Sequence, residues 1–154
     1  MKLIYKLLAT SFGAGYSPFA PGTVGAIVGC VLLWLLQRYQ LIDTLNTPFV
    51  FIGLIIIVTL LGVFVTNQLE EEWGKDPSKV VIDETIGLWI SMLLIPFSWF
   101  NLLLAFILFR FFDIAKPLGI RKMESINGGW GVMADDILAG IYANILLHII
   151  IYVI

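Results

Sequence analysis

Four long apolar runs constrain this chain more than any other feature, because runs of such length must be buried in a lipid bilayer or in a large core. They are separated by short polar stretches, and the longest of them carries no charged residue. The runs are Val24 to Leu36, Pro48 to Thr66, Thr85 to Phe109 and Ile137 to Ile154. Only 13% of the 154 residues are charged, whereas an average soluble domain has about 25%. We therefore expect an all-α, integral membrane helical bundle.

The lengths of these runs predict about four to five membrane-embedded helices in one domain over residues 1–154. Near the N-terminus, Lys2 and Lys6 stand among leucines and isoleucine, a pattern that predicts a short helix lying on the membrane surface. The net charge of −2 and the lack of a basic stripe argue against a nucleic-acid partner. Glycines in the apolar runs leave room for a homodimer contact.

The third run determines on which side of the membrane the polar stretches lie. As one straight helix it would separate Glu84 from Asp113 by about 40 Å and place them on opposite sides. The basic residues after the run would then lie outside, against the positive-inside tendency. Proline, serine and asparagine between Pro96 and Asn101 are typical turn residues. We therefore predict a helical hairpin around residues 85–112, with both polar stretches on the cytoplasmic side.

A helix start in the stretch "SPFAPGTVGA" provides a first candidate for anion binding. Thr23 follows a Pro-Gly pair and is a good helix N-cap, so we expect the helix to begin there. Free backbone N–H groups at such a start attract anions, and Gly22 would let a phosphate come close. On this stretch alone, an ordinary helix cap with small residues for packing is the favoured interpretation.

Two pairs of adjacent acids stand where the third and fourth runs begin. Asp83 and Glu84 precede the third run, and Asp135 and Asp136 precede the fourth. One pair alone is weak, because acids also complement the dipole of a helix N-terminus. Two pairs together suggest a Mg²⁺ site, since Mg²⁺ prefers carboxylate oxygens and commonly bridges protein acids to a substrate phosphate.

A third cluster follows the third run, where Arg110, Asp113 and Lys116 stand three residues apart. On a continuous helix these positions share one face. Ionisable groups at the edge of lipid are expensive unless they pair or function. With the paired acids they suggest attack on phosphorus by metal-activated water, while the bases hold the phosphate. A small ion or solute transporter is the alternative, although its acids would more naturally lie in mid-span.

Four motifs in order resemble those of the bacterial phosphatidylglycerophosphatase A family: "GYSPFAPGTVG", "VIDETIGLW", "FRFFDIAKPLGIR" and "NGGWGVMADDILAG". The resemblance implies a Mg²⁺-dependent lipid phosphatase of the bacterial inner membrane, with its active site at the cytoplasmic face. Such an enzyme removes the terminal phosphate of phosphatidylglycerophosphate. A broader phosphatidic acid phosphatase stays open as an alternative, as does the identity of the general base.

The resemblance also assigns roles to individual positions. As metal ligands it implies Asp83, Glu84, Asp113, Asp135 and Asp136. As catalytic residues we expect Asp83, Glu84, Asp113, Lys116 and Asp136. For binding of the substrate phosphate we expect Gly22, Thr23, Arg110, Lys116 and Arg121.

Overall fold

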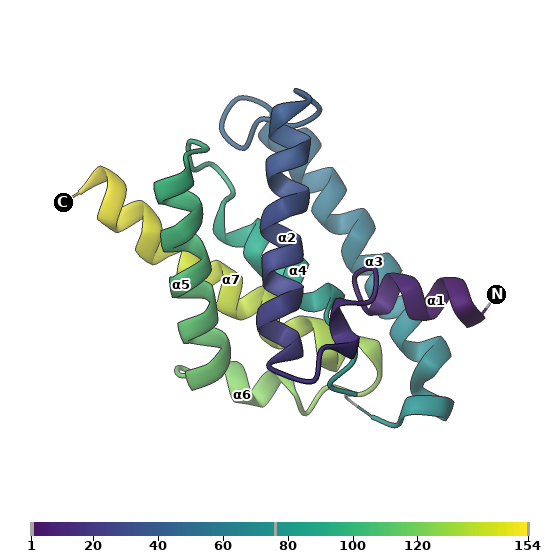
Figure 1. Cartoon of the computed structure of the whole chain (residues 1–154). Coiled ribbons are helices and arrows are strands. Elements are labelled where there is room, and N and C mark those ends of the chain that lie inside the picture. Colours follow the sequence, from purple (N-terminus) through teal and green to yellow (C-terminus); the bar gives the residue numbers. More distant parts are fainter. Residues whose placement is uncertain (1, 76, 154) are drawn as a thin grey trace.

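The computed structural model describes residues 2–75 and 77–153, and this part of the chain is helical without any strand (Figure 1). The expected all-α fold is confirmed. The elements are α1 (Lys2–Ala9), the 3₁₀ turn η1 (Ala14–Tyr16), α2 (Pro21–Arg38), α3 (Pro48–Trp73), α4 (Ile82–Ser91), α5 (Trp99–Ala115), α6 (Ile120–Met123) and α7 (Gly129–Tyr152).

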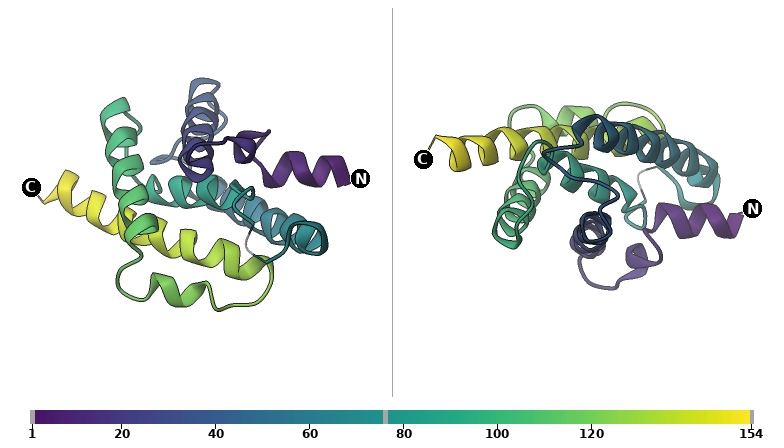
Figure 2. Two further views of the ribbon diagram at one scale, coloured as in Figure 1. Left: turned by 60° about the horizontal axis from the view of Figure 1, so that its bottom comes forward. Right: turned by 90° about the horizontal axis from the view of Figure 1, so that it is seen from above.

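The short helix α4 forms the centre of the bundle and packs against α2, α3, α5 and α7. The left view of Figure 2 shows it between α2 on one side and α7 on the other. Glycines allow this close packing, because a Cβ atom at Gly140 of α7 would overlap the backbone carbonyl of Gly87 in α4. On the opposite face, the Trp89 indole donates a hydrogen bond of 3.0 Å to the carbonyl of Gly29 in α2. The residues on α4 are consequently almost all buried.

The predicted break in the third apolar run is present, between the end of α4 at Ser91 and the start of α5 at Trp99. The Ser98 side chain caps α5 by accepting from the backbone N–H of Asn101 at 3.0 Å. The Asn101 side chain in turn donates to the carbonyl of Pro96 at 2.8 Å. The chain therefore reverses here, and the start of α4 and the end of α5 lie at the same end of the bundle.

Within the described residues, three helices are long and apolar enough to cross a bilayer, namely α2, α3 and α7. The helices α4 and α5 have 10 and 17 residues and are shorter than these spans. At the N-terminus, α1 packs against α3 and exposes Leu3, Ile4 and Leu7. An apolar face of this kind suits a helix at a membrane surface.

The ends of two long helices differ from those of the apolar runs. The helix α3 continues past Thr66 to Trp73, because the glutamates that follow are good helix formers. The helix α7 begins at Gly129, well before the predicted start at Ile137, and the Asn67 side chain accepts the hydrogen bond of the free Gly129 N–H at 2.6 Å. Ile154, the predicted end of the fourth run, lies outside the described residues.

Candidate active site

An acidic cleft of about 300 Å³ opens where the starts of α2, α4 and α7 meet the end of α5. Its walls come from segments far apart in the sequence, and the predicted acids all lie in them. The side chains and backbone that line it belong to Ala20, Pro21, Gly22, Pro77, Ser78, Val80, Val81, Asp83, Glu84, Arg110, Asp113, Lys116, Val132, Asp135 and Asp136. We call this space the acidic cleft.

Three carboxylates in the cleft lie close enough to share one cation. Glu84, Asp113 and Asp136 each offer an oxygen, and these oxygens lie within 4.8 Å of one another. Asp83 and Asp135 also line the cleft but are not part of this group of three. Three carboxylates at such distances repel one another unless positive charge lies between them. Their oxygen-only chemistry suits Mg²⁺, so the residues fit the expected metal.

Arg110 holds two of these three carboxylates. One guanidinium nitrogen of Arg110 forms ion pairs with both Glu84 and Asp113, the latter at 2.8 Å. Its Nε atom is buried and has no hydrogen-bond partner among the described residues. A buried donor without a partner costs free energy. The ion pairs therefore fix one end of the guanidinium and leave this donor unsatisfied.

Lys116 reaches the same acids by a route that the sequence pattern does not suggest. The expectation that it shares a helix face with Arg110 and Asp113 is wrong, because α5 ends at Ala115. Lys116 caps the helix in a left-handed conformation, with φ 45°, and Pro117 follows, where a helix cannot easily continue. The chain turns back, so the Lys116 ammonium lies 4.0 Å from Asp113 and 2.6 Å from Asp135.

The start of α2 also lies one turn earlier than expected. The N-cap is Ala20 and the helix begins at Pro21, so Thr23 lies in the first turn and is not the cap. Proline is favoured at this first helical position because its fixed φ suits a helix and it has no N–H to leave unpaired. Gly22 lines the acidic cleft, and Thr23 is not among the residues that line it.

Gly22 lies directly against the acids. A Cβ atom at this position would overlap the carboxylate of Glu84 and lie 3.3 Å from the guanidinium of Arg110. A glycine is therefore required if the Glu84–Arg110 pair is to stand where it does.

The two acid pairs occupy different positions in their helices. Asp83 and Glu84 lie in the first turn of α4, as expected, and Asp83 accepts the backbone N–H of Glu84 at 2.9 Å. Asp135 and Asp136 lie farther inside α7, because that helix begins at Gly129. The dipole of a helix terminus acts within the first turn, so it does not explain why these two acids are buried.

Burial and repulsion between carboxylates raise the pKa values of the two acids in α4. Burial raises the pKa of Asp83 well above its ordinary value, and the charge of Glu84 adds to this rise. Burial and the charge of Asp113 raise the pKa of Glu84 to about 7, although Arg110 opposes the rise. Burial is the larger cause of both shifts, and the neighbouring carboxylates add to it.

The positions of two residues differ from what the sequence suggests. Arg121 is exposed on α6 and does not line the cleft, so the structure does not bring it to the other expected phosphate-binding residues. Glu124, which no motif indicates, accepts from Lys116 at 2.6 Å. An acid in a polar loop carries no sequence signal for such a contact, since Lys116 reaches it only through the turn after α5.

Comparison with known proteins decides the family. The sequence profile of phosphatidylglycerophosphatase A matches residues 7–151. The chain belongs to this family. It is 33% identical to phosphatidylglycerophosphatase A of Escherichia coli, covering 95% of this chain and 83% of the relative, and 39% identical to that of Haemophilus influenzae, covering 95% and 88%. Membership identifies the chain as a lipid phosphatase, an enzyme of the membrane.

A further relative carries a different name. A Bacteroides thetaiotaomicron protein, named as a candidate phosphatidylinositol-3-phosphatase, is 46% identical over 93% of this chain and 91% of its own length. No solved structure matches the chain.

Proposed function

We propose that this protein hydrolyses the terminal phosphomonoester of phosphatidylglycerophosphate, with Mg²⁺ bound, and releases phosphatidylglycerol and inorganic phosphate. The observation that carries this proposal is the convergence of three carboxylates, Glu84, Asp113 and Asp136, with Arg110 in one cleft. Family membership and the names of two relatives support it.

The carboxylates would hold the metal and the two bases would hold the phosphate. Glu84, Asp113 and Asp136 are the best-placed ligands for Mg²⁺, which when bound polarises a phosphoryl oxygen and activates water. A phosphomonoester is itself an anion, so it enters a cleft rich in carboxylates only if positive charge compensates. This requirement, and not the acid pairs alone, makes a divalent cation the expected partner of the site.

Arg110 and Lys116 would position the phosphate within the cleft. One guanidinium nitrogen of Arg110 is already held by Glu84 and Asp113, so its remaining N–H groups would be the ones to meet a phosphate oxygen. Fixed donors of this kind stabilise the charge on the equatorial oxygens during phosphoryl transfer. Lys116, held between Asp135 and Glu124, contributes the second positive charge.

The membrane arrangement supports a lipid substrate. The cleft lies at the N-terminal ends of two long apolar helices, α2 and α7, so a lipid phosphate could reach it while the acyl chains stay in the bilayer. We place this end of the bundle at the cytoplasmic face of the bacterial inner membrane, because the basic residues Arg121 and Lys122 lie on α6, in the connection between α5 and α7.

A second candidate substrate is phosphatidylinositol 3-phosphate, which the name of the 46% identical relative favours. It presents the same chemical group as phosphatidylglycerophosphate, a phosphomonoester on a hydroxyl-bearing alcohol. Phosphatidic acid presents the phosphate directly on diacylglycerol and is the broader alternative.

The test is phosphate release by the purified protein in mixed micelles, with these three lipids, with Mg²⁺ or with a chelator. We expect release from phosphatidylglycerophosphate to exceed the other two and to need Mg²⁺. Asp113→Asn should abolish release, because it removes one metal ligand and one partner of Arg110. The matched control is Asp43→Asn, since Asp43 caps a loop turn outside the cleft and asparagine can accept the same backbone hydrogen bonds.

Three results would count against the proposal. Full turnover in Asp113→Asn would show that catalysis does not need this carboxylate. Release that is unaffected by the chelator would show that catalysis does not need Mg²⁺. A clear preference for phosphatidylinositol 3-phosphate would make the second candidate the substrate.

A further inference from the structure

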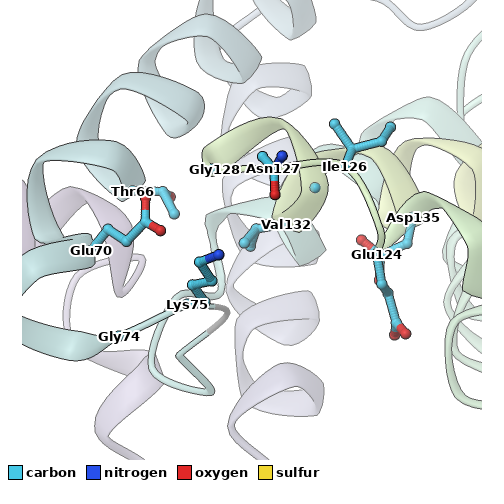
Figure 3. Close-up of a pocket in the computed structure, with 11 residues that line it drawn as sticks. Thr66, Glu70, Gly74, Lys75, Glu124, Ile126, Asn127, Gly128, Val132 and Asp135 are labelled. Atoms are coloured by element: carbon cyan, nitrogen blue, oxygen red, sulfur yellow. The ribbon is translucent and has the colours of Figure 1, made fainter.

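A second, smaller pocket lies beside the acidic cleft and shares a wall with it. It has a volume of about 90 Å³, several times the 10–15 Å³ or so that one water molecule needs. Asp135 and Val132 line both spaces. Figure 3 shows it between the last turns of α3 and the loop before α7. Its lining consists of Thr66, Glu70, Gly74, Lys75, Glu124, Ile126, Asn127, Gly128, Gly131, Val132 and Asp135. We call it the side pocket.

Two buried oxygens in its wall lack partners. The hydroxyl of Thr66 and the Oδ1 atom of Asp135 are buried, and neither has a hydrogen-bond partner among the described residues. Thr66 is 4% exposed and Asp135 is 7% exposed. Leaving such groups unpaired is costly, and most buried polar groups in proteins are paired.

The contrast with Thr59 makes the unpaired hydroxyl of Thr66 informative. Thr59 lies two turns earlier on the same helix and is buried to a similar degree. Its hydroxyl donates to the carbonyl of Ile55 at 2.8 Å, the usual partner of a buried threonine in a helix. Thr66 makes no such bond and lines the pocket. Its hydroxyl has almost no accessible surface as it stands, so it would meet a ligand there after a rotation about χ1.

The chemistry of the lining points to hydroxyl groups as that ligand. The ammonium of Lys75 and the amide of Asn127 are donors, whereas Glu70, Glu124 and Asp135 are acceptors. A second phosphate would be repelled by these carboxylates, and an apolar group would leave the Thr66 hydroxyl and the Oδ1 atom of Asp135 unpaired. A hydroxyl both donates and accepts, so it suits a wall of mixed donors and acceptors.

We propose that the side pocket receives the hydroxyl-bearing alcohol of the lipid headgroup while the phosphate lies in the acidic cleft. Because Asp135 belongs to both spaces, a phosphate held beside Lys116 places its alcohol next to the side pocket. The pocket then sets the preference for headgroups that carry a polyol over phosphatidic acid, which has none. This inference rests on the proposed phosphatase function of the acidic cleft.

The test compares Thr66→Val with Thr59→Val, which is the same substitution in the same helix away from the pocket. Valine has nearly the shape of threonine, so the fold should be kept, and a thermal melt checks this. One lost hydrogen bond to the alcohol corresponds to roughly a 3- to 10-fold loss in kcat/KM. We expect this loss in Thr66→Val for phosphatidylglycerophosphate and no change for phosphatidic acid. Thr59→Val should change neither.

A second pair of variants tests the same inference at exposed positions, where a substitution does not disturb the core. Lys75 is exposed, so Lys75→Gln should fold. It should lower the ratio of kcat/KM for phosphatidylglycerophosphate to kcat/KM for phosphatidic acid, as Thr66→Val should. Lys122→Gln removes an exposed lysine that does not line the side pocket and is its control. Inhibition gives a readout without turnover of lipid: Thr66→Val should weaken inhibition by glycerol 3-phosphate but not by inorganic phosphate.

The outcomes separate this inference from the proposed function. Thr66→Val and Lys75→Gln could leave the preference for phosphatidylglycerophosphate over phosphatidic acid unchanged, or lower activity equally on both lipids. In either case the side pocket does not bind the headgroup alcohol, and the inference fails. If Thr59→Val lowers the ratio as strongly, the effect comes from helix α3 and the inference fails. If the unaltered protein releases phosphate from no lipid, the proposed function fails instead.

Discussion

Because Gly22 contacts Glu84, a substitution at Gly22 should lower activity while it leaves the melting temperature nearly unchanged. In Gly22→Ala the new methyl group would overlap the Glu84 carboxylate, so that carboxylate must move. The atom in its way is the far end of a flexible side chain, so a shift of the carboxylate, and not of the backbone, relieves the overlap. Alanine is also the better helix former, by about 0.5–1 kcal/mol relative to glycine. The melting temperature should therefore change little.

Activity should respond very differently, because the displaced carboxylate belongs to the group of three that includes Asp113 and Asp136. It is also the partner of Arg110. A displacement of about 1 Å in a positioned catalytic group can lower the rate by roughly 100-fold. We expect Gly22→Ala to lose kcat/KM by about this factor and to need more Mg²⁺ for half-maximal rate.

The assay is lipid phosphate release at a series of Mg²⁺ concentrations, together with a thermal melt in the same detergent. Gly53→Ala is the matched control, since a Cβ atom at Gly53 meets no other atom within 4 Å. It should keep full activity. If Gly22→Ala is as active as Gly53→Ala at every Mg²⁺ concentration, the Glu84 carboxylate does not need its position and the reasoning fails.

Two further predictions concern stability. Because the pKa of Glu84 is raised from 4.5 to about 7 in the folded protein, the metal-free fold binds its proton more tightly than the unfolded chain does. Stability without metal should therefore fall as pH rises from about 4.5 to about 7. A melting curve series with chelator checks this, and Glu84→Gln should weaken the dependence, while Asp83, whose pKa is also raised, keeps part of it. In Gly87→Ala, a methyl group would overlap the Phe109 ring and lie 2.8 Å from the carbonyl of Asp136. Overpacking of this kind costs about 1–3 kcal/mol, so its melting temperature should drop clearly below that of Gly53→Ala.

The sequence predicts the elements of this fold better than their ends. Apolar runs locate the three long helices, because a span needs length and hydropathy that no polar segment imitates. The turn residues around Pro96 locate the break between α4 and α5. The start of α7 at Gly129 is not predictable in this way, since it depends on the side chain of Asn67 in another helix.

The same limit applies to the site. Acid pairs and the Arg110–Asp113 spacing can be read from the sequence, and the structure brings these residues into one cleft. The contact of Lys116 with Glu124 and Asp135 depends on a left-handed residue at the end of α5. Non-glycine residues rarely adopt that conformation, so no local pattern would indicate it.

The position of the carboxylates follows from the way α4 crosses α7. The two backbones are in contact at Gly87 and Gly140, where a Cβ atom at Gly140 would overlap the carbonyl of Gly87. Glu84 precedes Gly87 by about one helical turn, and Asp136 precedes Gly140 by about one turn. Their carboxylate oxygens lie within 4.8 Å of one another, so both acids lie on the same side of the crossing. A side chain at either glycine would push the helices apart and separate the two carboxylates, so the packing that buries α4 is also what brings the candidate metal ligands together.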